Sequence, residues 1–212
     1  MQTTMKRINL SNDTVVDIPD GPIGISCSGG VDSSLLLYIL MANCTDTIHV
    51  FTLSNDRKGR ANAVIVPKVI ERCIQLTGNL NVIQHSYYAA DQIENTLFDV
   101  PREYLKNKTI NCIFFAITAN PPADVVFAAQ GSEHSNRDPL TIKKEIEHNG
   151  FLYQPFVNKD KKTIAEIYKQ LNLMEALFPV TRSCEQVGKL EYYDHCGKCW
   201  WCEERQWGFG RV

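Results

Sequence analysis

Short apolar runs alternate along the chain with longer runs in which apolar positions recur at helical spacing. The runs that predict buried strands are Ile23–Cys27, His49–Leu53, Leu80–His85 and Asp124–Ala129. The runs that predict helices are Ser33–Met41, Ala61–Thr77, Ile110–Ala119, Thr141–His148 and Ile164–Leu171. Strands and helices that alternate at this spacing predict an α/β fold with a doubly wound, mostly parallel sheet.

The ends of these elements carry further signals. The polar, turn-rich residues 1–20 predict a short hairpin or strand before the core. Pro67 either starts its helix or kinks it, and the pair Pro121-Pro122 ends the apolar helix over 110–119. The stretch from Thr163 to Glu166 fits a capping box, which makes Thr163 the expected cap of the last helix.

Composition limits the classes of protein that the chain can represent. Its 212 residues, 44% of them hydrophobic, predict one domain with a small appendage. The formal net charge of −2 does not favour a nucleic-acid partner. No apolar run approaches the roughly 20 residues that span a bilayer, and residues 1–7 are not followed by the apolar core of a signal peptide. These features predict a cytoplasmic protein with no membrane partner.

The segment between the first predicted strand and the first predicted helix points to phosphate chemistry. It reads Ser28-Gly29-Gly30-Val31-Asp32-Ser33-Ser34. Adjacent glycines allow a sharp turn and a close approach to a ligand, and N–H groups at a helix start, together with the serine hydroxyls, can bind an oxyanion. The spacing is neither a Walker A loop nor a dinucleotide-binding turn. We therefore predict that it binds a phosphate chain; a plain turn is the alternative.

Four of the eight cysteines lie near the C-terminus, at Cys184, Cys196, Cys199 and Cys202. A Cys-x-x-Cys turn points its sulfurs to one side, and a thiol from a preceding loop completes a tetrahedron that suits structural zinc. An iron–sulfur cluster, a catalytic cysteine pair for sulfur transfer and unliganded packing cysteines are the alternatives. The remaining four lie in apolar runs and are predicted to be core residues: Cys27, Cys44, Cys73 and Cys112.

These two motifs together carry a family resemblance. The Ser-Gly-Gly-x-Asp-Ser string is similar to the PP-loop of the ATP pyrophosphatase superfamily. Within it, the chain resembles the 7-cyano-7-deazaguanine synthase family, through the PP-loop, Thr181-Arg182-Ser183-Cys184, the later cysteines and a tail with Arg205 and Phe209. The stretch from Pro155 to Lys161 is also similar to a Pro-Leu-x4-Lys stretch of that family.

The resemblance implies a specific organisation and activity. Residues 1–180 would form a PP-loop ATP-binding domain and residues 181–212 a zinc-binding segment packed on it. The family uses ATP and ammonia to convert a carboxyl group on a 7-deazaguanine base into an amide and then a nitrile, with release of AMP and pyrophosphate. ATP, magnesium and zinc are the implied cofactors, a deazapurine carboxylate and ammonia the implied small-molecule partners, and a homodimer the implied assembly.

The resemblance also assigns roles to residues of the loop and beyond it. The ATP phosphates would be bound by Ser28, Gly29, Gly30, Val31, Asp32, Ser33 and Ser34. Asp32, Ser33 and Lys161 would take part in catalysis, with Asp32 helping to hold magnesium and Lys161 reaching the phosphates as a point charge. A solvated lysine within the run 159–162 is the alternative interpretation of Lys161.

The chain departs from the family at two places. The family's Arg-Asn pair corresponds here to Asn107-Lys108-Thr109, and its Tyr-Pro-Asp-Cys-Arg motif is replaced by the residues that follow Gly131. Those residues include a polar group that could meet a substrate or form a solvated loop: Glu133, His134, Arg137 and Asp138. Their roles stay open, as does the nature of the base.

Alternative functions follow from the same motifs. One is a PP-loop enzyme that thiolates tRNA, another is a related ligase that joins the activated base to an amine other than ammonia, and a third is a non-catalytic nucleotide- and zinc-binding module. The late aromatic residues either stack on a planar base or wrap the metal site: Tyr192, Tyr193, Trp200, Trp201 and Trp207.

Overall fold

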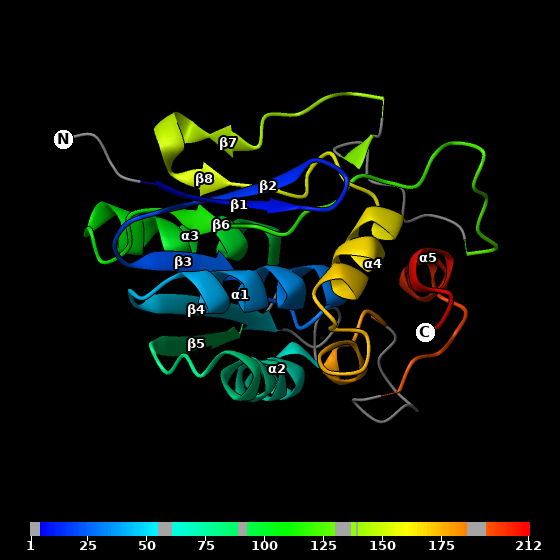
Figure 1. Ribbon diagram of the computed structural model, residues 1–212, viewed down its shortest axis with the longest axis horizontal. Helices are drawn as coiled ribbons and strands as arrows, with labels where there is room; N and C mark the ends of the chain where they lie inside the picture. Colours follow the sequence, from blue (N-terminus) through cyan, green and yellow to red (C-terminus); the bar gives the residue numbers. More distant parts are fainter. Residues whose placement is uncertain (1–4, 55–60, 89–92, 130–136, 139, 186–193) are drawn as a thin grey trace.

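The computed structural model describes residues 5–54, 61–88, 93–129, 137–138, 140–185 and 194–212 (Figure 1). Its centre is a six-stranded sheet in the order β5-β4-β3-β6-β8-β7. The strands are β3 (Ile23–Ser26), β4 (Ile48–Ser54), β5 (Val82–Tyr88), β6 (Ile113–Phe114), β7 (Ile146–Glu147) and β8 (Leu152–Tyr153). All neighbours pair in parallel except β7 and β8. The prediction of an α/β fold with a mostly parallel sheet is confirmed.

Helices cover both faces of this sheet, which makes it doubly wound. The connecting helices are α1 (Val31–Asn43), α2 (Asn62–Thr77) and α3 (Ile93–Lys106). One core contains α1 and α2 with Val50 of β4, whereas the next residue, Phe51, packs in a second core that Tyr104 of α3 completes. The chain runs outward from β3 to β5 and returns to β6, so the strand order reverses between β3 and β6. Ligands bind at such a reversal point in α/β sheets.

The N-terminal residues form the predicted hairpin. Its strands, β1 (Met5–Leu10) and β2 (Thr14–Pro19), pair antiparallel in a separate two-stranded sheet. Val16 and Ile18 are buried in the main core. A residue outside the hairpin holds its turn, since Lys159 Nζ donates a hydrogen bond to Asn12 O at 2.7 Å.

The C-terminal part adds helices beyond the carboxyl ends of the strands (Figure 1). These are α4 (Lys161–Gln170), a 3-10 turn at Phe178–Val180 and α5 (Trp200–Phe209); another 3-10 turn covers His148–Gly150. Helix α5 packs so closely on α4 that a Cβ atom on Gly208 would lie 2.5 Å from Lys161 Cγ. Asp160 caps α4 by accepting a hydrogen bond from Thr163 N at 2.9 Å. The helix thus begins before Thr163, and the expected Thr163 cap is wrong.

Three predicted elements in the second half of the chain are also wrong. The expected helix over 110–119 contains the two-residue strand β6, which lies between β3 and β8. A central strand is apolar on both faces, so periodicity alone does not separate it from a buried helix. The expected strand over 124–129 is a turn and irregular chain, with Val126 87% exposed. The expected helix over 141–148 contains β7 instead.

Other expectations concern Pro67, the remaining cysteines and membrane spans. Pro67 lies inside α2 rather than at its start. The four cysteines outside the C-terminal group are buried as predicted: Cys27, Cys44, Cys73 and Cys112. Burial raises the pKa of the Cys73 and Cys112 thiols, which suits a packing role. Within the described residues, we find no helix that combines the length and apolarity a membrane crossing requires.

Candidate functional site

The Ser/Gly segment leaves β3 at the reversal point of the sheet and enters α1. Gly29 has φ +77°, a conformation that favours glycine, and a Cβ atom there would lie 2.6 Å from Ile65 Cγ2. Gly30 is the N-cap of α1 and has no side chain to cap the helix. The N–H groups of the first turn of α1, with the positive end of its dipole, are therefore available to an anion.

The loop is ordered by its own hydroxyls. Ser33 Oγ accepts from Ser28 N at 3.2 Å and donates to Gly30 O at 3.3 Å. Ser34 is fully buried, and its Oγ has no hydrogen-bond partner in the described part of the chain. The structure thus places Ser28, Gly30 and Asp32 on a cavity wall, with the hydroxyls of Ser33 and Ser34 behind it.

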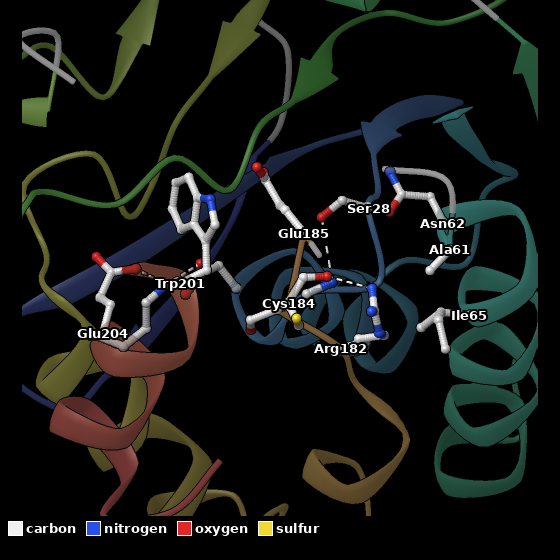
Figure 2. Close-up of a pocket in the computed structure, with 13 residues that line it drawn as sticks. Ser28, Ala61, Asn62, Ile65, Arg182, Cys184, Glu185, Trp201 and Glu204 are labelled. Atoms are coloured by element: carbon white, nitrogen blue, oxygen red, sulfur yellow. Dashed lines mark hydrogen bonds and ion pairs between the residues drawn. The ribbon is translucent and has the colours of Figure 1, made fainter. Parts of the chain in front are cut away.

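This cavity has a volume of about 190 Å³. Figure 2 shows it between α2, with Asn62 and Ile65, and α5, with Trp201 and Glu204. The segment that carries Arg182 crosses beside the N-terminus of α1. The described residues that line the cavity are Ser28, Gly30, Asp32, Ala61, Asn62, Ile65, Lys161, Arg182, Ser183, Cys184, Glu185, Trp201 and Glu204. The cavity therefore joins the Ser/Gly loop to the cysteine-rich segment.

Lys161 lies inside this cavity wall rather than in solvent. Its side chain is 4% exposed, forms an ion pair with Asp32 Oδ2 and places Nζ 3.4 Å from Glu204 Oε2. Asp32 Oδ1 is buried without a hydrogen-bond partner in the described chain. A carboxylate oxygen without a partner in the described chain, at the start of a helix whose N–H groups could bind phosphate, suits a magnesium ligand. The interpretation of Lys161 as a solvated lysine is wrong.

The segment from Thr181 to Glu185 braces the loop from outside. Arg182 N donates to Gly29 O at 2.9 Å, and Arg205 Nη1 donates to Thr181 Oγ1 at 2.9 Å. Arg205 is 2% exposed, and burial lowers its pKa to about 10. Its guanidinium also lies 3.9 Å from the ring centre of Phe178. Arg205 thus links the segment 181–185 to the 3-10 turn at Phe178–Val180 that precedes it.

The four C-terminal cysteines converge on one point. Their sulfurs all lie within 4.8 Å of one another, with Cys196 Sγ 3.9 Å from Cys202 Sγ and Cys199 Sγ 4.0 Å from Cys184 Sγ. Tetrahedral zinc with Zn–S bonds of about 2.3 Å separates its sulfurs by about 3.8 Å. The cluster can therefore bind zinc in a closed, four-thiolate shell. An iron–sulfur cluster places its thiolates on different irons, which needs a wider spacing.

The metal cluster and the cavity share residues. Cys184 belongs to the cluster and also lines the cavity. The neighbouring His195 accepts a hydrogen bond from Ser183 N at 3.3 Å, and burial lowers its pKa to about 4. A neutral imidazole is the form that can accept this bond. The four-cysteine cluster and the segment 181–185, which contacts the Ser/Gly loop, are thus one continuous structure.

The predictions for the polar residues after Gly131 and for the late aromatic residues differ in their outcomes. Gly131, Glu133 and His134 lie outside the described residues, as do Tyr192 and Tyr193. Arg137 is 6% exposed and donates to Glu204, so a solvated position is wrong for it. Asp138 is half-buried, and its Oδ1 accepts from Leu140 N at 3.0 Å. Trp200 and Trp201 contact Arg137, and Trp207 contacts Lys162.

Sequence reasoning missed Glu204, which is 1% exposed and has both carboxylate oxygens in ion pairs. It also missed Asn62 and Glu185 in the cavity wall. A signal for Glu204 was present, because it lies four residues before Gly208 on α5, and that spacing places both on one helix face. The close approach that Gly208 permits brings this face against Lys161.

The chain is similar to solved structures but not to a protein-family model or a curated protein. No protein-family model matches the sequence, and curated proteins gave no match either. Among solved structures, NMN synthetase from Francisella tularensis is similar with a TM-score of 0.44 and 12% identity, over 90% of this chain and 77% of that one. Similarity at this level does not indicate what this chain binds or catalyses.

Proposed function

We propose that the chain is an ATP-dependent carbon–nitrogen ligase that adenylates a carboxylate of a 7-deazaguanine-type base and transfers ammonia to it. The observation that carries this proposal is the Ser/Gly loop at the reversal point of the sheet, whose first-turn N–H groups and Asp32 face a cavity. The four-thiolate cluster beside it supports the same family resemblance. An adenine nucleotide would place its β- and γ-phosphates against the loop.

A carboxylate reacts poorly with ammonia because its oxygen is a poor leaving group, so the reaction begins by activating that oxygen. A carboxylate oxygen attacks the α-phosphorus of ATP. The bond between that phosphorus and the oxygen that bridges the α- and β-phosphates breaks, and pyrophosphate leaves. Ammonia then attacks the acyl carbon, AMP leaves, and the amide forms with loss of a proton. Adenylation of the amide oxygen in a second cycle releases a second pyrophosphate, and loss of AMP together with both N–H protons of the amide nitrogen then gives the nitrile. Holding the reactants side by side supplies much of the acceleration.

Four side chains in the cavity wall have a place in this proposal. Magnesium, when bound, neutralises phosphate charge, and Asp32 would hold it through the oxygen that has no partner in the described chain. Lys161 would exchange its contact with Asp32 for the phosphates. Trp201 and Glu185, which also line the cavity, would contact the base and the amine, and a ligase for another amine is the variant of this proposal.

The thiolating alternative needs a persulfide cysteine or an iron–sulfur cluster. The cysteines next to the cavity converge on a single point instead, a geometry that favours one structural ion. We therefore prefer the ligase.

The test is product analysis with ATP, ammonia and 7-carboxy-7-deazaguanine. We expect pyrophosphate and AMP to be released only when all three are present, together with an amide or nitrile detected by mass spectrometry. Asp32→Ala should abolish turnover and leave about one zinc per chain, because Asp32 contacts the phosphate site and not the cluster. Turnover that persists in Asp32→Ala, or ATP binding without turnover of any carboxylate, would contradict the proposal.

A further inference from the structure

Four charged side chains form a continuous row from the Ser/Gly loop into the protein, in the order Asp32, Lys161, Glu204 and Arg137. Glu204 lies between two cations, with Oε1 paired to Arg137 Nη2 and Oε2 3.4 Å from Lys161 Nζ. The side chains of Lys161, Glu204 and Arg137 are 4%, 1% and 6% exposed. Water therefore screens these charges poorly.

Arg137 is fixed on the side of this row that faces away from the cavity. Its Nε donates to Thr118 O at 2.7 Å, and its Nη2 donates to Ala119 O at 3.2 Å. Its guanidinium lies 5.3 Å from the ring centres of both Trp200 and Trp201. Arg137 is not among the described residues that line the cavity, whereas two residues that it contacts, Glu204 and Trp201, are; its ionic link to the cavity is Glu204.

The charge balance of the row shows what Arg137 can do. Two carboxylates, Asp32 and Glu204, meet two cations, Lys161 and Arg137. If Arg137 were absent, Lys161 would be the remaining cation paired with Glu204 among the described residues. A buried carboxylate attracts its last cation strongly, and Lys161 would then be held away from a phosphate.

We propose that Arg137 is a positioning residue that neutralises Glu204 and so leaves the Lys161 ammonium available to the triphosphate. This inference rests on the proposed function, because it assumes that ATP binds beside Lys161. It adds a residue that touches no substrate and acts through two other side chains. Arg137 thereby couples the chain after residue 136 to the phosphate site.

Double-mutant cycles on ATP affinity test this proposal. The full zinc-loaded chain is titrated with ATP in excess magnesium by calorimetry, without carboxylate, under conditions in which circular dichroism shows every variant folded. We expect Arg137→Ala to weaken ATP binding about tenfold in the unmodified chain, and to change it by less than about threefold when it is added to Glu204→Gln. Arg7→Ala is the matched control, because Arg7 pairs with Asp17 in the distant hairpin.

A second cycle uses Lys161→Met. Because Arg137 acts through Lys161, Arg137→Ala should cause no further loss of ATP affinity in that background. If Arg137→Ala alone does not fold, its effect is measured in the Glu204→Gln background, where no buried carboxylate is left without a cation, and no loss is expected. Additive losses in either cycle, or a loss in the Glu204→Gln background, overturn the proposal. An unmodified chain that does not bind ATP would instead remove the proposed function itself.

Discussion

At the scale of single residues, Gly29 has the strictest conformational requirement in the Ser/Gly loop. It combines φ +77° with backbone so close to α2 that a Cβ atom would meet Ile65 Cγ2 at 2.6 Å. Its carbonyl also accepts the hydrogen bond from Arg182 N. Any side chain at this position has to move the loop or the helix behind it.

Gly29→Ala should therefore weaken ATP binding by at least about tenfold, measured by calorimetry. Gly78→Ala is the matched control, since Gly78 has φ +71° and a Cβ atom there would meet nothing within 4 Å. Both variants strain the backbone, and the control should lose stability without losing ATP affinity. Equal ATP affinity in both would mean that the loop conformation does not matter for the nucleotide.

The sequence predicted those site residues whose signals are local. The Ser/Gly loop and the run from Cys196 to Cys202 each occupy seven consecutive positions, so turn and ligand geometry could be predicted from them directly. The pairing of Glu204 with Lys161 and Arg137 could not, because it depends on how α5 packs on α4. Isolated charged residues in a sequence are normally exposed, which hid Glu204, whereas the resemblance assigns Lys161 to the site and leaves the role of Arg137 open.

At the scale of elements, the segment 181–185 links the cysteine cluster to the loop. Cys184 supplies one thiolate, and Arg182 N, two residues earlier, donates a hydrogen bond to Gly29 O.

The first two strands of the main sheet, β3 and β4, and helices α1 and α2 could be predicted because their apolar runs are longer than those of the later strands. Strands β6, β7 and β8 have two residues each, too few for a period, and their place in the sheet comes from tertiary pairing.

Removal of zinc should loosen this link. Cys199→Ser, or treatment with a chelator, is expected to lower the melting temperature by about 10 °C, because zinc binding supplies much of the folding free energy of a short cluster. ATP affinity should fall with it, since the brace on Gly29 is lost. Metal content, thermal unfolding and calorimetry measure these effects. Cys73→Ala, in the core, should keep about one zinc per chain; unchanged ATP affinity without zinc would show that the two sites are independent.

At the scale of the whole molecule, the two faces of the sheet differ in polarity. The α1–α2 face packs on the larger of the two hydrophobic cores. On the α3 face, His49 Nδ1 lies 2.9 Å from His85 Nε2, and His85 Nδ1 lies 3.3 Å from Tyr104 Oη. Burial lowers the pKa of both histidines, and His85 lowers that of His49 further.

This pair, together with His195, whose pKa is also lowered, should make stability depend on pH. The unfolded chain binds protons at the ordinary histidine pKa of about 6.5, above the lowered pKa values of the folded state, so the free energy of unfolding falls as pH drops below about 6.5. Urea denaturation at pH 7.5 and 5.5 should show the loss. The variant with His49→Gln and His85→Gln should show a smaller difference between the two pH values; an unchanged difference would assign the effect to other groups.

The most direct measurement is a crystal structure of the chain with magnesium and an ATP analogue that resists cleavage between the α- and β-phosphates. We expect the β- and γ-phosphates to accept hydrogen bonds from the N–H groups at the start of α1, with Asp32 and Lys161 beside them and the α-phosphorus open to the cavity. Nucleotide bound elsewhere, with these N–H groups turned to other protein atoms, would contradict the central claim.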